Sequence, residues 1–126
     1  MLSYGRQNID QADIDAVIEV LKSPWLTQGD TIADFERELS ASLACKHACV
    51  VSNGTAALHL TALALGWQTG DVVLTSPITF VASANAILYV GAIPDFVDIN
   101  LSDNTIDIDK LEEKIKEHKR NGNKVK

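Results

Sequence analysis

The sequence predicts an α/β fold in which a parallel-dominated sheet carries helices on both faces. Short apolar runs, the length of buried strands, alternate with longer runs whose apolar residues recur at helical spacing. The chain has 126 residues, 46% of them hydrophobic and only three of them proline, which is enough apolar material for one sizeable core. Strands that alternate with helices are joined by crossovers, so their sheet is parallel.

Two amphipathic helices joined by a polar loop are expected before residue 46. Asn8 or Asp10 is a suitable N-cap for the first helix, which Ser23 and Pro24 end. The loop follows up to Asp30 because its Pro, Gly and polar residues interrupt the periodicity. A second helix is expected over residues 31–43.

Residues 46–126 are expected to form the first part of a second domain, after an amino-terminal helical segment over residues 1–45. The expected elements are strands at 48–51, 72–75 and 93–99 and helices at 55–65, 80–89 and 109–119. Gly66 and Gly91 end two of these helices. Residues 124–126 would only begin another strand, so we expect this chain to be a piece of a longer protein that exposes apolar area.

Charge and hydropathy exclude several function classes. The formal net charge is −6, which argues against general affinity for nucleic acid. The cation-rich end over residues 114–126 is interpreted as the solvated end of a helix, where positive charge suits the macrodipole. No signal peptide is recognisable and the apolar runs are too short to cross a bilayer, so we expect a cytoplasmic protein without membrane contact.

The two cysteines do not predict a metal site. Cys45 and Cys49 stand four residues apart, with His47 between them and His59 ten residues further on, and no other thiol completes a zinc site. Cys49 falls in the expected first strand, where a free cysteine packs as a small hydrophobe.

The segment Ser52-Asn53-Gly54-Thr55 stands between an expected strand and an expected helix, where ligands bind in open α/β sheets. Gly54 permits close backbone approach, the N–H groups of Thr55 and Ala56 would be free at the helix start, and the Thr55 hydroxyl is another donor. These groups could hold a phosphate. The segment is equally a good turn and N-cap, and neither standard glycine-rich phosphate motif is present.

The next strand-to-helix junction, "TSPITFVASANA" from Thr75, carries one aromatic residue, Phe80. Phe80 could anchor the core or present a flat face for stacking on a planar ring. Both junctions lie at the same edge of the sheet, and together they suit a phosphorylated heterocycle. Asn85 is interpreted as a helix-packing residue.

The motifs "LTQG", "SNGTAAL" and "TFVASANA", in this order, resemble the amino-terminal part of the DegT/DnrJ/EryC1/StrS family of sugar aminotransferases. The resemblance runs along essentially the whole chain. It implies the aspartate-aminotransferase fold, fold type I of pyridoxal-phosphate (PLP) enzymes, whose three-layer large domain would be incomplete in this chain.

The resemblance also implies site residues. Gly54, Thr55 and Ala56 match the segment that holds the cofactor phosphate, and Phe80 matches the aromatic residue that stacks on the pyridine ring. The positions that match the nucleotide-sugar pocket are Tyr4, Pro24, Trp25, Leu26, Thr27 and Gly54. No metal is implied.

Within the family the motifs are similar to the enzyme of pseudaminic acid biosynthesis that aminates C4 of a UDP-linked 4-keto-6-deoxy-N-acetyl sugar. The implied partners are this sugar and an amino acid donor, glutamate, and the implied assembly is a homodimer with shared active sites. The family's Schiff-base lysine and the carboxylate that pairs with the ring nitrogen match nothing up to residue 126, so we expect this chain alone to be inactive.

Three alternatives remain open on the sequence. The substrate could be another keto sugar, or the enzyme could be a dehydratase of the same family in which a histidine replaces the lysine. Outside the family, the chain could be a self-contained α/β module that binds a nucleotide or a partner, which would require a sheet completed within its 126 residues.

Overall fold

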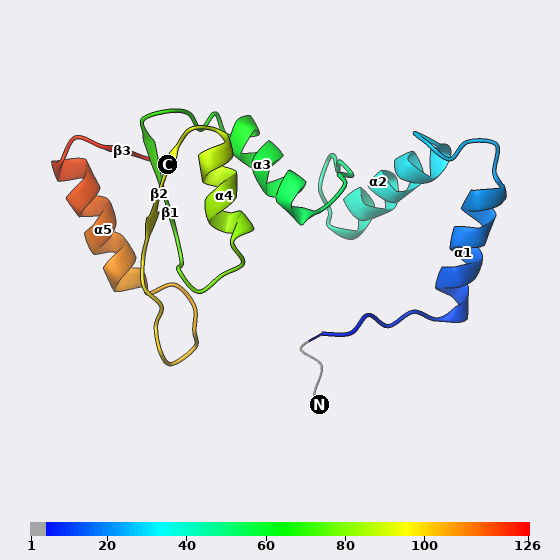
Figure 1. Cartoon of the computed structure of the whole chain (residues 1–126), viewed down its shortest axis with the longest axis horizontal. Helices are drawn as coiled ribbons and strands as arrows, with labels where there is room; N and C mark the ends of the chain where they lie inside the picture. Colours follow the sequence, from blue (N-terminus) through cyan, green and yellow to red (C-terminus); the bar gives the residue numbers. More distant parts are fainter. Residues whose placement is uncertain (1–4) are drawn as a thin grey trace. The chain divides into compact units, whose positions relative to one another are not determined.

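The computed structural model describes residues 5–126 and divides the chain into two compact units, one up to Val50 and the other from Val51 to Lys126 (Figure 1). The first unit consists of helices α1, Gln11–Lys22, and α2, Asp30–Ser42. Asp10 is the N-cap of α1, where its Oδ1 accepts the Asp13 N–H at 3.1 Å and its own N–H reaches Asp13 Oδ2 at 3.0 Å. This reciprocal pair satisfies two donors at the helix start, so Asp10 rather than Asn8 begins the helix.

The second unit follows the predicted alternation of helices and strands. Its elements in order are α3 (Gly54–Ala64), β1 (Asp71–Thr75), α4 (Ala82–Tyr89), β2 (Ile93–Phe96), α5 (Ile108–Arg120) and β3 (Lys124–Val125). The strands form one parallel sheet in the order β2-β1-β3. Val72 of β1 pairs with Ile93 on one side and with Val125 on the other, which makes β1 the central strand.

Helices cover both faces of this sheet (Figure 1). The chain moves outward from β1 to β2 and then returns across β1 to β3, so crossovers of one hand place α4 and α5 on opposite faces. The α/β architecture with a parallel sheet is therefore confirmed.

The core of the second unit is small and rich in alanine. Val73, Ile87 and Ala92 form its centre, and Trp67 and Val90 pack against it. Ala62 of α3 and Ala82 and Ala86 of α4 are also buried, and their short side chains let these two helices pack closely. Gly66, whose φ is +67°, ends α3 in a left-handed conformation that glycine adopts without strain, as the sequence predicts.

The prediction of a strand at residues 48–51 is wrong, because these residues form no strand in the structure. A strand needs a neighbouring backbone for its hydrogen bonds, and the Val50 N–H instead donates to Glu36 Oε1 at 2.8 Å. Cys49, expected to pack as a buried residue of this strand, is exposed. The strand expected at 93–99 ends at Phe96 because β1 ends at Thr75, and beyond it Ile99 forms a lone antiparallel bridge with Ile106.

An ion pair between the buried carboxylate of Asp71 and the exposed lysine Lys124 connects β1 to β3. Asp71 is 1% exposed, its Oδ1 lies 2.9 Å from Lys124 Nζ, and its Oδ2 accepts the Gln68 N–H at 3.1 Å. The hydrogen bond from Lys124 lowers the pKa of the Asp71 carboxyl below its usual value, against burial, which acts in the opposite direction. A charge that is removed from water in this way depends on its partner.

Lys124→Met is expected to destabilise the chain at pH 7, because it leaves the Asp71 carboxylate buried without its cation. A folded-state pKa below the unfolded value of about 3.9 contributes stability that is present above that pH and is lost as the pH falls through the folded pKa. The variant should therefore also lose less stability than wild type between about pH 5 and 3. Chemical denaturation across this range measures both effects.

Lys116→Met is the matched control for this experiment. Lys116 pairs with Glu112 on α5, and both side chains are more than half exposed. Exposed pairs of this kind contribute little, so the control should denature like wild type at pH 7. Equal destabilisation by the two variants would contradict a special role for the Asp71–Lys124 pair.

Candidate functional site

The start of α3 lies at the same level as the end of β1. A helix of eleven residues and a strand of five are each roughly 16 Å long. The chain leaves the carboxyl end of α3 and enters β1 after a short turn over residues 65–70, so the two elements run in opposite directions. The amino end of the helix therefore stands near the carboxyl end of the strand, where ligands bind in open α/β sheets.

A hollow of about 490 Å³ lies at this place in the second unit. It is lined by Gly54, Thr55, Ala57, Leu58, Thr61, Phe80 and Ala82. The hollow brings together Gly54, Thr55 and Phe80, which the sequence singled out on two separate junctions. Leu58 and Thr61 were missed, although their spacing of four and seven residues from Gly54 places them on the same helical face.

The start of α3 offers hydrogen-bond donors without an acidic side chain. Among the hydrogen bonds of residues 5–126, none uses the N–H of Gly54, the N–H of Thr55 or the Thr55 hydroxyl. The first turn of α3 has no acidic residue. Free N–H groups at the positive end of a helix dipole attract anions, so this part of the hollow suits a phosphate.

The Ala56 N–H is not free, and in this respect the sequence-based expectation is wrong. It donates to Asn53 Oδ1 at 2.9 Å, which makes Asn53 the N-cap of the helix. Ala56 does not line the hollow. The sequence left two interpretations of residues 52–55 open, a helix-capping turn and a phosphate-binding segment. In the structure Asn53 caps the helix, and Gly54 and Thr55 keep free hydrogen-bond donors.

Phe80 presents its ring to the hollow instead of the core. The residue is 73% exposed, which excludes the interpretation of a core anchor within the described part of the chain. Its loop is held from both sides: Ser76 Oγ accepts the Ile78 N–H at 3.2 Å, and the Thr79 and Ser83 hydroxyls are hydrogen-bonded at 3.1 Å. The sequence predicts a site for a phosphorylated ring, with an aromatic face beside hydrogen-bond donors that can bind the phosphate, and the hollow has both features. Asn85 is half-buried in α4 and does not line the hollow.

The other predicted substrate positions lie in the first unit. Pro24, Trp25, Leu26 and Thr27 occupy the loop between α1 and α2, and all four are exposed. Gly29 closes this loop so tightly that a Cβ there would come within 2.8 Å of the Trp25 carbonyl oxygen. Trp25 is thereby held by its backbone while its side chain stays 71% exposed. Tyr4 lies outside the described residues.

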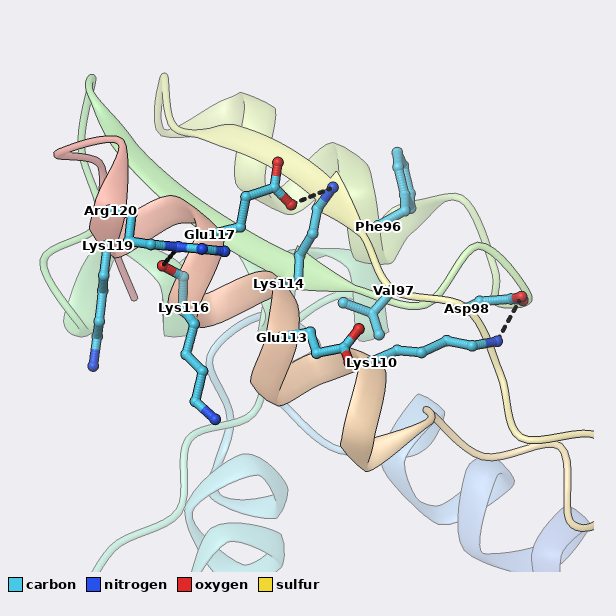
Figure 2. Close-up of a pocket in the computed structure, with 10 residues that line it drawn as sticks. All are labelled: Phe96, Val97, Asp98, Lys110, Glu113, Lys114, Lys116, Glu117, Lys119 and Arg120. Carbon is cyan, nitrogen blue, oxygen red and sulfur yellow. Dashed lines mark hydrogen bonds and ion pairs between the residues drawn. The ribbon is translucent and has the colours of Figure 1, made fainter.

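A second and larger groove lies along α5 at the end of β2 (Figure 2). Two of its lysines have carboxylate partners: Lys110 Nζ is 3.1 Å from Asp98 Oδ2, and Lys114 Nζ is 3.1 Å from Asp95 Oδ2. These carboxylates raise the pKa values of both lysines. These ion pairs tie α5 to β2 and to the residues that follow it, and Lys119 and Arg120 add further positive charge to the groove.

Asp95 has a second side-chain partner on α5, His118. His118 Nε2 lies 2.8 Å from Asp95 Oδ2. Partial burial raises the pKa of the Asp95 carboxyl, but hydrogen bonds from His118, from the Phe96 N–H and from Lys114 outweigh it, and the net pKa lies below its usual value. This cluster orders α5 against the edge of the sheet.

The described residues contain no group of three or more His, Cys, Asp or Glu side chains that could hold a metal ion. Cys45 and Cys49 are both exposed, and the Cys45 thiol lies 3.3 Å from the His47 carbonyl oxygen. In the same part of the chain, no helix has the length and apolarity needed to cross a membrane.

Comparison with known proteins decides the family. The model of the DegT/DnrJ/EryC1/StrS aminotransferase family matches residues 7–121. The chain belongs to this family. It is 48% identical over 115 residues to the UDP-4-amino-4,6-dideoxy-N-acetyl-beta-L-altrosamine transaminase of Campylobacter jejuni, a match that covers 91% of this chain and 30% of that protein. The chain thus spans about 30% of the length of the curated relatives it matches.

Solved structures of family members share the fold. The aminotransferase PseC of Helicobacter pylori, described as involved in the biosynthesis of pseudoaminic acid, superposes with a TM-score of 0.79 at 36% identity, over 88% of this chain and 30% of that one. A chain from Streptococcus pneumoniae described as a sugar aminotransferase in its PLP form gives a TM-score of 0.82 at 33% identity, over 89% of this chain and 29% of that one. The predicted fold type I is confirmed for the part of the domain that this chain contains.

Gly54→Ala is expected to weaken ligand binding without lowering the free energy of unfolding. Gly54 is the first residue of α3, and a Cβ there meets no heavy atom within 4 Å. The free energy of unfolding should stay unchanged or rise by about 0.5 kcal/mol, because alanine restricts the unfolded chain. The methyl group projects beside the free donors, so affinity for pyridoxine 5′-phosphate should fall about tenfold, the effect of weakening one charged hydrogen bond.

Calorimetric titration and thermal unfolding measure the two quantities on the same protein. Pyridoxine 5′-phosphate is the probe because it lacks the aldehyde that reacts with surface lysines. Undiminished affinity in Gly54→Ala would show that the ligand does not approach this backbone.

Proposed function

We propose that this chain is the part of a PLP-dependent nucleotide-sugar aminotransferase that binds the cofactor phosphate and supports the cofactor ring. The observation that carries the proposal is the hollow that joins the free donors of Gly54 and Thr55 to the exposed ring of Phe80. Family membership and the solved PLP and PMP forms of related chains support the identity of the cofactor.

Three residues of the hollow, Gly54, Thr55 and Phe80, have a role in this proposal. The N–H groups of Gly54 and Thr55 and the Thr55 hydroxyl bind the phosphate, whose charge the helix dipole favours. Phe80 stacks on the ring and fixes its plane. Ala56, also predicted as a cofactor-binding residue, contributes the capped first turn that orients these donors. Pyridoxal phosphate, when bound, supplies the electron sink that transamination requires.

The chain itself supplies binding groups and no proton-transfer group at this place. None of the described residues that line the hollow is a lysine, a histidine or a carboxylate. Lys110, Lys114 and Lys124 are each committed to a carboxylate elsewhere in the second unit. We therefore infer that the reactive lysine and the carboxylate that pairs with the ring nitrogen come from other segments of the enzyme, and that this chain alone lacks transaminase activity.

The proposed substrate is a UDP-linked 4-keto-6-deoxy-N-acetyl sugar, aminated at C4 with glutamate as the amino donor. The identity of 48% to the altrosamine transaminase of Campylobacter jejuni supports this choice, as does the similarity to PseC. Pro24, Trp25, Leu26, Thr27 and Gly54, together with Tyr4, are proposed to line the sugar-nucleotide pocket. The exposed indole of Trp25, on a loop that Gly29 holds tightly, is suited to stack on a planar base.

The proposal also covers the domain organisation of the chain and the assembly of the enzyme. Residues 1–45 form an amino-terminal helical segment and residues 46–126 the first part of the PLP-binding large domain of a cytoplasmic homodimer. Exposed apolar side chains support an assembly that covers them: Val17 and Leu21 on α1 and Phe35 on α2 all stand open to solvent.

Thr55→Val tests the phosphate assignment. Loss of one hydrogen bond to a charged group costs about 1.5–3 kcal/mol, so affinity for pyridoxine 5′-phosphate should fall roughly 10- to 100-fold, while affinity for unphosphorylated pyridoxine stays the same. Thr55→Ser, which keeps a hydroxyl, should restore binding. Both affinities are measured by calorimetric titration.

Thr61→Val is the matched control in the same hollow. Thr61 Oγ1 already donates to the Ala57 carbonyl at 2.8 Å, so its removal should leave affinity for the phosphorylated ligand within about twofold of wild type. If both variants bind like wild type, or if both lose affinity for pyridoxine as well, the phosphate assignment is wrong.

The sugar-nucleotide assignment is tested by tryptophan fluorescence. The chain has two tryptophans, so Trp67→Phe leaves Trp25 as the only reporter and Trp25→Phe leaves Trp67. UDP should quench the first variant saturably, because stacking changes the environment of the exposed indole, and should leave the second unchanged. A flat titration of Trp67→Phe would argue against the loop at Pro24–Thr27 as part of the pocket.

A further inference from the structure

Asn53 holds the start of α3 through three hydrogen bonds. Its Oδ1 accepts the Ala56 N–H at 2.9 Å, its carbonyl oxygen accepts the Ala57 N–H at 3.1 Å, and its Nδ2 donates to Ser52 Oγ at 3.3 Å. The hydroxyl of Ser52 occupies the amide nitrogen, which fixes the amide with its oxygen toward the helix. The side chain is therefore oriented from both ends.

The Asn53 cap determines which N–H groups of the first turn of α3 remain free to bind a ligand. A helix begins with four N–H groups that have no partner within the helix. The Asn53 side chain takes that of Ala56, whereas the Ala57 N–H makes the first ordinary bond of the helix, to the Asn53 carbonyl oxygen. The N–H groups of Gly54 and Thr55 and the Thr55 hydroxyl remain free, and both residues line the hollow. The capped turn also fixes the directions of the free donors, which an unfilled cap would allow to fray.

Aspartate would cap this helix as well as asparagine does, and the chain uses it elsewhere. Asp10 caps α1 and Asp107 caps α5, where the side chain of Asp107 accepts from the N–H groups of Asp109 and Lys110. An aspartate at a helix N-terminus also gains from the dipole. At α3 the cap is neutral, and a carboxylate there would lie within one helical turn of any phosphate held by Gly54 and Thr55 and would repel it.

We propose that Asn53 is a positioning residue for the phosphate group: its neutral amide caps α3 and aims two backbone donors and one hydroxyl at the ligand without placing a negative charge beside it. This inference rests on the proposed function, since it needs a phosphate at Gly54 and Thr55. Asn53 does not touch the ligand; it acts through the first turn of α3.

The test compares three variants of the chain by calorimetric titration with pyridoxine 5′-phosphate and with unphosphorylated pyridoxine, and by thermal unfolding without ligand. Asn53→Asp keeps the cap and adds a charge, so it should melt at or above the wild-type temperature and lose at least about tenfold in affinity for the phosphorylated ligand only. A merely structural cap would not produce this separation of melting temperature from affinity.

Asn53→Ser and Asn53→Ala complete the comparison. Serine is neutral and caps well, so Asn53→Ser should bind both ligands within about twofold of wild type. Asn53→Ala removes the cap, so it should melt at a lower temperature and bind the phosphorylated ligand more weakly, a loss that serine rescues.

Two different failures can be told apart. If wild type prefers the phosphorylated ligand but Asn53→Asp and Asn53→Ala bind it like wild type, the positioning role is overturned while the proposed function stands. If wild type does not distinguish pyridoxine 5′-phosphate from pyridoxine, no phosphate is held at Gly54 and Thr55, and the proposed function falls together with this inference.

Discussion

The two parallel ladders on either side of β1 are the constraint on which the second unit depends. Val72 pairs with Ile93 in one ladder and with Val125 in the other, so the start of β1 is paired on both sides, whereas β3 does not extend along residues 73–75. Right-handed crossovers then require α4 and α5 to cover opposite faces of the sheet. They also leave the carboxyl end of β1 open, and this is the edge at which the hollow lies.

The geometry of the hollow follows from the lengths and sizes of the residues around it. α3 and β1 have nearly equal lengths and opposite directions, which returns the start of the helix to the level of the loop that carries Phe80. The alanines at 62, 82 and 86 let α3 pack close to α4, so this loop and the first turn of α3 share one cavity. Larger side chains at these positions would separate the two halves of the site.

Charge is distributed differently at the hollow and on α5. Lysines and carboxylates on α5 and its neighbours neutralise one another in pairs such as Lys110–Asp98 and Lys114–Asp95. The hollow has no charged side chain among its described lining residues and offers only oriented dipoles. An anion bound there meets donors that are already directed and meets no carboxylate among those described residues that would repel it.

Sequence periodicity by itself determined the order and type of most elements, because the apolar spacing of each helix and the glycines that end α3 and α4 are local properties. It also placed Gly54, Thr55 and Phe80 at strand-to-helix junctions. Only the tertiary structure decided hydrogen-bond partners. Residues 48–51 carry a strand pattern, but Glu36 takes the Val50 N–H, and residues 124–125 pair with β1 although their pattern is two residues long. The exposure of Phe80 and the capping of Ala56 by Asn53 were likewise undecided until the chain was folded, because both depend on which groups lie opposite in space.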